Sequence, residues 1–311
     1  MRDYLIKRTI EALGVILAIA AITFFVLNIV PGDPVRVMLG EMADEATVQQ
    51  VRHSMGLDRP VLEQFFGWLG NMLRGDLGTS YTQRKPVITL MGNALKYTAR
   101  LAGWAYLFAL ALGLFMGVMA AVYHGKLLDR LLMTLAVAGI SAPAFWVAVI
   151  LQIVFALNLK WFPLAGVKKA GAFFLPTIAL GVRYAASIAR VTRTSMLEVL
   201  SQDYMRTAEA KGLARWTVIL GHGFRNALIP ISTIAGTQLG DIFTGSILIE
   251  TIFAIPGIGS MLLTAINQRD LPLIEGGVMY IALICVVVYL IVDILYAVVD
   301  PRIRLGGEVS E

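Results

Sequence analysis

Long apolar runs separated by shorter polar segments dominate the pattern of this chain. A helix needs roughly 20 apolar residues to cross about 30 Å of hydrocarbon. Six runs reach that length, so the pattern predicts an all-α, polytopic membrane protein with six transmembrane helices. They lie at Ala12–Val30, Leu101–Tyr123, Leu131–Leu159, Ala170–Ala189, Ala227–Ile249 and Gly276–Val299. The third run is overlong and contains Pro143, which predicts a kink or tilt.

Composition and charge agree with a membrane protein. The chain is 58% hydrophobic and 15% charged, with a mean hydropathy of +0.74, values typical of a protein in a bilayer. The net charge of +5 is carried by loop residues and does not indicate nucleic-acid binding. Cys285 is the single cysteine, which excludes an internal disulfide and a cysteine metal cluster. The first run is too long for a signal peptide core and lacks a small-residue cleavage site, so it predicts an uncleaved anchor.

Basic residues in the short loops predict the orientation, because cytoplasmic loops carry an excess of Lys and Arg. With the N-terminus inside, thirteen basic residues fall on the cytoplasmic side and four in the two short outer loops. The inner residues are Arg2, Lys7, Arg8, Lys126, Arg130, Arg190, Arg193, Arg206, Lys211, Arg215, Arg225, Arg302 and Arg304; the outer ones are Lys160, Lys168, Lys169 and Arg269. Both termini are therefore expected to be cytoplasmic.

This topology divides the chain into four parts. Residues 1–30 are the N-terminal cytoplasmic end and first transmembrane helix, and residues 31–100 an extracytoplasmic loop. Residues 101–304 form a five-helix transmembrane domain with a cytoplasmic loop at 190–226, and residues 305–311 a cytoplasmic tail.

The outer loop carries two segments with helical spacing of apolar residues, Asp44–Met55 and Pro60–Arg74. Asp44 and Asp58 stand where helix N-termini are expected. The second segment has an apolar stripe of Val61, Phe65, Trp68, Leu69 and Leu73. Two interpretations remain open and compatible: a helical cap packed on the span ends, and a surface that contacts an extracytoplasmic partner.

Motifs for catalysis or metal binding are missing from the sequence. It has no G-x-x-x-x-G-K-[ST] phosphate loop, no H-E-x-x-H and no G-x-S-x-G. The three histidines, His53, His124 and His222, are scattered and flank the spans, so no shared metal site is expected. The chain is predicted to be no enzyme, to hold no cofactor and not to hydrolyse ATP by itself.

The polar stretch Ser201–Pro230 lies between two predicted spans and contains Arg206, Lys211, Arg215 and Arg225. Gly212 interrupts it and, because glycine accepts positive φ, predicts a turn between two short helices. Such a segment on the cytoplasmic face indicates either a docking surface for another subunit or a solvated basic loop.

The same stretch resembles the cytoplasmic loop of the permease subunits of binding-protein-dependent ABC importers, whose pattern is E-A-A-x-x-x-G. Arg206 and Thr207 replace its first two residues, which is the form of the peptide, nickel and opine branch, R-T-A-x-A-K-G-L followed by R-N-A-L-x-P. Further motifs of that branch cover essentially the whole chain. They are Pro31–Pro34, Leu57–Pro60, Arg74–Gly78, Glu250–Phe253, Pro256–Gly259, Asn267–Asp270 and Val299–Arg304. The chain thus resembles the B-type permease of an oligopeptide or dipeptide importer.

This resemblance implies an ABC type I importer permease fold in a bacterial or archaeal cytoplasmic (inner) membrane, and transport of peptides. It also implies a second homologous permease, two ABC ATPase subunits that carry ATP and Mg, and an extracytoplasmic solute-binding protein. The ATPase-coupling loop would comprise Arg206, Thr207, Ala208, Glu209, Ala210, Lys211, Gly212 and Arg215. Nickel chelates, glutathione or sugars remain alternative solutes for the same machinery. A membrane enzyme or an ion-coupled secondary transporter remains a different class, although no convincing internal repeat supports the latter.

Ionisable residues within spans are costly and mark functional positions. Arg183 lies about eleven residues into the fourth span and Asp241 about twelve into the fifth, which at about 1.5 Å per residue puts both near the bilayer midplane. We assign Arg183, Gln238 and Asp241 to the translocation path. Arg183 and Asp241 form either a structural ion pair or a pair that meets a zwitterionic peptide, and Asp293 in the sixth span binds a neighbouring helix or snorkels. Two G-x-x-x-G motifs, Gly113–Gly117 and Gly236–Gly240, predict close helix contacts, within this chain or with a second permease.

Overall fold

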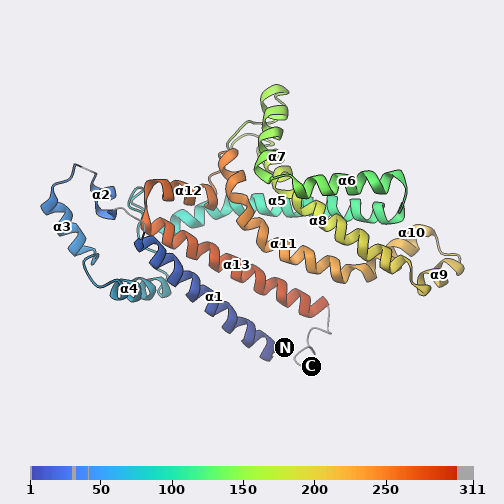
Figure 1. Ribbon diagram of the computed structural model, residues 1–311, viewed down its shortest axis with the longest axis horizontal. Helices are drawn as coiled ribbons and strands as arrows, with labels where there is room; N and C mark the ends of the chain where they lie inside the picture. The colour runs from blue at the N-terminus through green and yellow to red at the C-terminus, as the bar shows by residue number, and fades with distance from the viewer. Residues whose placement is uncertain (1, 30–32, 41, 300–311) are drawn as a thin grey trace. The chain divides into compact units, whose positions relative to one another are not determined.

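The computed structural model describes residues 2–29, 33–40 and 42–299, and every regular element in this part of the chain is a helix (Figure 1). The predicted end of the first span at Val30, the Pro31–Gly32 turn, the C-terminal motif from residue 300 onward and the predicted tail 305–311 lie outside the described residues. The chain divides into two compact units, Met1–Thr98 with Pro256–Val287, and Ala99–Ile255 with Val288–Glu311.

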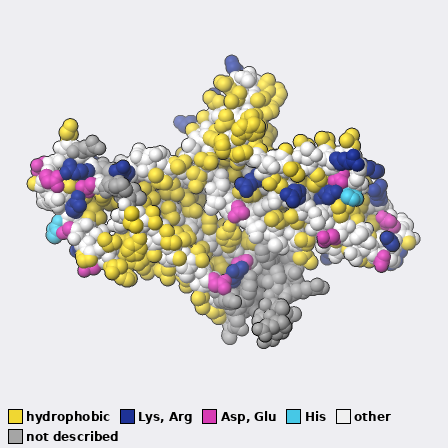
Figure 2. Space-filling view, in the orientation of Figure 1, with side chains coloured by type: hydrophobic (Ala, Val, Ile, Leu, Met, Phe, Trp, Pro, Cys, Tyr) yellow, Lys and Arg dark blue, Asp and Glu magenta, His cyan; other side chains and the backbone are white. Residues whose placement is uncertain are grey.

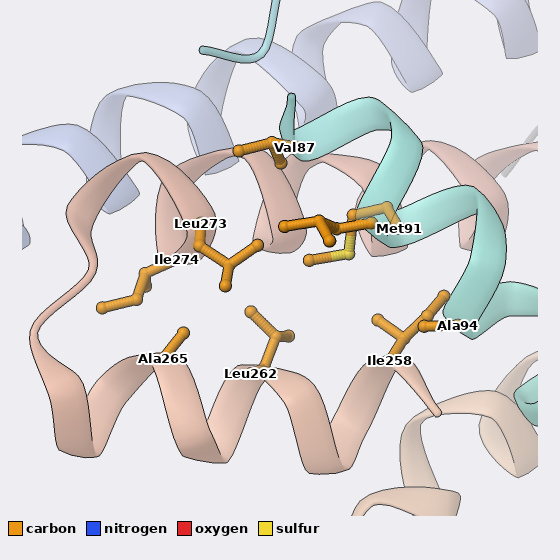
Figure 3. Packing of buried hydrophobic residues seen from close by; sticks show 9 residues of the cluster. Val87, Met91, Ala94, Ile258, Leu262, Ala265, Leu273 and Ile274 are labelled. Atoms are coloured by element: carbon orange, nitrogen blue, oxygen red, sulfur yellow. The ribbon is translucent and has the colours of Figure 1, made fainter. Parts of the chain in front are cut away.

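The first unit contains the long helix α1, three short helices, the beginnings of α5 and α13, and α12. Their bounds are α1 (Arg2–Ile29), α2 (Pro34–Leu39), α3 (Glu45–Ser54), α4 (Val61–Leu73), α5 (Val87–Val122), α12 (Ile258–Gln268) and α13 (Leu271–Val299). Its core lies where α5, α12 and α13 meet, and Figure 3 shows side chains from these three helices pointing toward one another. They include Val87, Met91 and Ala94 of α5, Ile258, Leu262 and Ala265 of α12, and Leu273 and Ile274 of α13.

The three short helices between α1 and α5 begin after different N-cap residues. Asp33 caps α2 by accepting a hydrogen bond from Val35 N at 3.0 Å, next to a proline in the first turn. Asp44 is the N-cap of α3, as predicted. The start predicted at Asp58 is wrong, because Pro60 precedes α4. Asp58 instead binds His53, 2.6 Å from Nδ1 to Oδ2, and this hydrogen bond lowers the pKa of its carboxyl.

The apolar stripe of α4 is only partly covered. Phe65 and Trp68 pack against Phe24 of α1, with ring centroids 5.4 and 5.6 Å apart. Val61 and Leu73 remain exposed. The stripe therefore packs on α1 through its two aromatic side chains and stays exposed at its two ends.

Asp270 ties the loop before α5 to the corner between α12 and α13. Its buried carboxylate accepts hydrogen bonds from Ser80 Oγ (2.5 Å), Thr82 Oγ1 (2.7 Å) and the backbone N–H groups of Tyr81 and Thr82. Burial works against ionisation of this group, but these donors outweigh it and lower its pKa. The pKa of the Tyr81 hydroxyl is raised to about 12, chiefly by burial.

The second unit is built around α8, which packs against α6, α7 and α11. Its elements besides the ends of α5 and α13 are α6 (Leu127–Ser141), α7 (Ala144–Leu151), the π-helical η1 (Gln152–Asn158), α8 (Phe174–Leu200), α9 (Asp203–Ala210), α10 (Arg215–Thr217), the π-helical η2 (Val218–Phe224) and α11 (Arg225–Ile252). Each predicted span thus corresponds to helical segments. The helix of the second span, α5, begins at Val87 and not at the predicted Leu101.

The kink predicted in the third span is confirmed and is large. The helices before and after Pro143 are bent by 105°, because Pro143 has no backbone N–H to continue α6 and becomes the N-cap of α7. In Figure 1, α7 and the segment after it turn away from α6, and Figure 2 shows mainly hydrophobic side chains over this part.

Within the described residues, three helices are long and apolar enough to cross a membrane: Arg8–Ile29, Val87–Val122 and Leu271–Ile294, with the bent pair as a fourth candidate. Helices α8 and α11 are 27 and 28 residues long, which suffices by length. Charged side chains such as Arg183, Arg190 and Asp241 make them less apolar.

The Gly113–Gly117 motif brings α5 and α8 into close contact inside this chain. A Cβ atom placed on Gly113 would lie 2.7 Å from the backbone oxygen of Ala185. A Cβ atom on Gly117 would lie 2.4 Å from the Cβ of Thr192. The close approach predicted at this motif is therefore confirmed.

Candidate functional site

Helix α8 carries a polar stripe along one face. Arg183, Ser187, Arg190, Thr194 and Glu198 follow one another at intervals of three or four residues, which places them on the same side of a helix. All are exposed except Ser187, which is half-buried, whereas the opposite side of α8 is buried. The apolar contacts that hold α8 in the unit therefore leave this polar face uncovered.

Helix α11 has a matching stripe. Thr233, Thr237, Asp241 and Thr244 are exposed at the same helical spacing. Buried residues of α11, among them Ala235 and Ile242, lie between these four residues in sequence and belong to the buried side of the helix. Since α8 and α11 pack against each other, the two polar faces lie next to each other.

The two stripes line a cavity of about 560 Å³. Its lining from α8 includes Arg183, Tyr184, Ser187 and Arg190; its lining from α11 includes Thr237, Gln238, Asp241 and Thr244. A second cavity of about 480 Å³ shares Ser187 and Arg190 with the first and extends along α8 to Glu198. The three residues predicted for the translocation path, Arg183, Gln238 and Asp241, therefore lie around one cavity.

Asp241 accepts hydrogen bonds from two tyrosines, one at its carboxylate and one at its backbone oxygen. Tyr289 donates its hydroxyl to Asp241 Oδ1 at 3.2 Å, and Tyr184 donates to the backbone oxygen of Asp241 at 3.0 Å. Among the described residues there is no salt bridge between Asp241 and Arg183. The structural ion pair is therefore not formed in this structure, and both charges face the shared cavity.

Gln238 is the buried polar residue of the cavity. Its side chain is 5% exposed, and its Oε1 atom has no hydrogen-bond partner among the described residues. A buried acceptor without a partner costs about 1–3 kcal/mol.

The predicted coupling loop forms α9, α10 and η2. Gly212 has φ of +77° and makes the turn between α9 and α10, as predicted. Met205 and Ala208 of α9 pack on Val218, which fixes the loop against the end of α8. Ala208 is thus a packing residue, whereas Arg206, Thr207, Glu209, Ala210, Lys211 and Arg215 are exposed. Figure 2 shows charged side chains gathered over this end of the second unit.

The loop also exposes large apolar side chains that were not predicted as site residues. Tyr204, Leu213, Trp216 and Leu220 are each between 42% and 51% exposed. Their signal was large apolar side chains within an otherwise polar stretch. Together with the basic residues they form a mixed apolar and basic surface, which is typical of a protein contact.

Two further residues of this site, Arg190 and Tyr289, were not predicted as site residues. Arg190 was counted only as a loop charge, although its helical spacing from Arg183 could have placed it on the same face. Tyr289 carries no such signal, because its contact with Asp241 depends on how α13 packs.

No group of three or more metal-ligating side chains occurs in the described part of the chain.

Two family models together match nearly the whole chain. Residues 113–305 match the binding-protein-dependent transport system inner membrane component, and residues 1–102 match the N-terminal region of the membrane components of such systems.

Curated relatives match this chain over nearly its full length. The glutathione transport system permease protein GsiC of Salmonella paratyphi A is 39% identical over 304 residues, which cover 98% of this chain and 99% of that protein. The same-named protein of Escherichia coli K12 is 38% identical over the same shares.

Solved structures share the fold. The inward-facing MetNI methionine ABC transporter matches with a TM-score of 0.59 at 16% identity, over 68% of this chain and 97% of that one. An amino acid ABC transporter solved with histidines matches with a TM-score of 0.51, also at 16% identity, over 69% and 94%.

Proposed function

The chain belongs to the inner-membrane permeases of binding-protein-dependent ABC transporters, and from this membership we propose that it carries glutathione or a closely similar short peptide across the membrane. Membership implies three kinds of partner: an ATPase, a partner permease and a solute-binding protein. ATP hydrolysis belongs to the ATPase, so this chain is a transport subunit and not an enzyme.

The choice of solute rests on one observation, the 39% identity over 98% of the chain to permeases of glutathione transport. The sequence-based prediction placed dipeptides and oligopeptides first and glutathione among the alternatives. These relatives favour the alternative. Glutathione is itself a short peptide, so the proposal stays within the solute class that the motifs indicate.

The polar faces of α8 and α11 support a role as the translocation path. Arg183 and Asp241 lie at membrane depth, and placing either in hydrocarbon costs at least about 2–3 kcal/mol on insertion scales. A stable assembly must therefore cover this face with water or with a polar partner. A second, homologous permease facing it would enclose the path between the two chains.

The loop from α9 to η2 is proposed to dock on an ATPase subunit, with two such subunits in the complete transporter. Its exposed Arg206, Lys211 and Arg215 would meet acidic groups, while Trp216 and Leu220 would enter an apolar groove. Rigid attachment through Met205 and Val218 would transmit ATPase movement to α8. The basic charge of this side supports a cytoplasmic position for the loop and for both termini.

Stimulation of ATP hydrolysis tests the proposal. The complete complex in nanodiscs should hydrolyse ATP faster when its binding protein is added with reduced glutathione than when it is added empty. Stimulation by a dipeptide but not by glutathione would refute the proposed solute. Transport of any solute by a preparation without an ATPase would refute the ABC assignment and favour an ion-coupled transporter.

A further inference from the structure

We propose that the cavity between α8 and α11 is a transient binding site for a peptide that carries two carboxylates and one ammonium group. This inference rests on the proposed function, because it requires that the solute pass along this face. It adds that the permease itself recognises the charges of the solute after the binding protein has released it.

The charges of the cavity are complementary to such a solute. Two cations, Arg183 and Arg190, and one anion, Asp241, line it. Reduced glutathione at neutral pH carries two carboxylates and one ammonium group, so each charge has an opposite partner. A simple dipeptide carries one of each and would leave one arginine without a carboxylate.

The spacing of the charges also fits. Arg183 and Arg190 are seven residues apart on one face of α8, which corresponds to about 10 Å along the helix axis. Three extended peptide units span roughly 10–11 Å. A tripeptide-sized solute is therefore long enough to place one carboxylate at each guanidinium, and a guanidinium binds a carboxylate through two parallel hydrogen bonds.

The remaining groups of the cavity are suited to the ammonium and amide groups. Tyr289 donates its hydroxyl to the carboxylate of Asp241, so this carboxylate is oriented before the solute arrives. Gln238 also lines the cavity, between Thr237 and Asp241 on the same helix. Thr237 and Thr244 already donate to backbone oxygens of their own helix, which leaves their hydroxyl oxygens as acceptors.

Equilibrium binding tests the inference. The complete complex, without binding protein and in nanodiscs, is titrated with reduced glutathione and with its glycine monoethyl ester, which lacks one carboxylate. Loss of one charged hydrogen-bonded pair should weaken binding about tenfold. We therefore expect glutathione to bind about tenfold more tightly than the ester.

Variants identify the residues responsible. Arg183→Gln and Arg190→Gln should each bind glutathione about tenfold more weakly, and one of the two should no longer distinguish glutathione from the ester. Lys169→Gln removes one exposed positive charge outside the cavity and should bind like the wild type. If an arginine-to-glutamine variant does not assemble, the arginine-to-lysine variant replaces it, since it keeps the charge but loses the two parallel hydrogen bonds.

Equal affinity of the wild type for glutathione and the ester would overturn the inference, as would full discrimination by both arginine variants. In either case ATP-driven glutathione uptake by the wild type would leave the proposed function standing. Absence of that uptake would instead refute the proposed function.

Discussion

Adding one methyl group at Gly117 should destabilise the second unit. The new Cβ of Gly117→Ala would lie 2.4 Å from Thr192 Cβ and 2.6 Å from the backbone oxygen of Ala189. Carbon atoms in contact are normally about 3.5–4.0 Å apart, so α5 and α8 must separate by more than about 1 Å. Overpacking of this kind costs about 1–3 kcal/mol. It exceeds the gain of about 0.8–1.0 kcal/mol that alanine has over glycine in a helix interior.

Gly103→Ala is the matched control, because it lies in the same helix, is exposed and has no atom within 4 Å of its added Cβ. It should be neutral or slightly stabilising. The assay is the apparent unfolding temperature of the purified protein in detergent, followed by the loss of its monodisperse peak in size-exclusion chromatography. Gly117→Ala should unfold at a lower temperature than the wild type and Gly103→Ala should not. Equal unfolding temperatures for the two variants would refute the close packing of α5 on α8.

Three further predictions concern the loop, the first unit and the topology. Gly212→Val should strain the turn of the coupling loop, whose φ is +77°, and uncouple ATP hydrolysis from transport, whereas Gly103→Val, in α5 and outside the loop, should not; normal transport by an intact Gly212→Val complex would contradict this role. Asp270→Asn should lower stability at pH 7 by about 2 kcal/mol. The lowered pKa of the Asp270 carboxyl means that its ionised form stabilises the fold, and this stabilisation is lost as the pH falls through that pKa. The difference in unfolding temperature between wild type and Asp270→Asn should therefore shrink below about pH 4. A difference that does not depend on pH would contradict an ionised Asp270. Gln50→Cys in a Cys285→Ala background should react with an impermeant thiol reagent in intact cells, and labelling only after lysis would invert the topology.

Local sequence signals predicted the helices and their interruptions. Apolar runs correspond to the long helices, Pro143 breaks the third span, and Gly212 makes the turn of the loop. Each of these features is decided by a few neighbouring residues. The small residues at Gly113 and Gly117 predicted a close contact but could not name α8 as its partner.

Features that depend on distant segments were not predicted. Asp270 receives its hydrogen bonds from residues almost two hundred positions earlier, at Ser80 and Thr82, and no periodicity reports such a pairing. Asp241 and Arg183 were correctly placed in the interior of their helices, but Tyr289 of α13 holds the carboxylate instead of the arginine. Depth along a helix follows from the sequence, whereas rotation about the helix axis is set by packing.

ATP-driven uptake of reduced glutathione into proteoliposomes tests the central claim most directly. The vesicles contain this chain with its partner permease and ATPase, ATP is enclosed on the side of the ATPase, and the binding protein is outside. We predict accumulation of radiolabelled glutathione that requires ATP and the binding protein and does not respond to dissipation of ion gradients. Uptake that persists without ATP and collapses with an ion gradient, or no uptake of glutathione while another solute accumulates, would contradict the account.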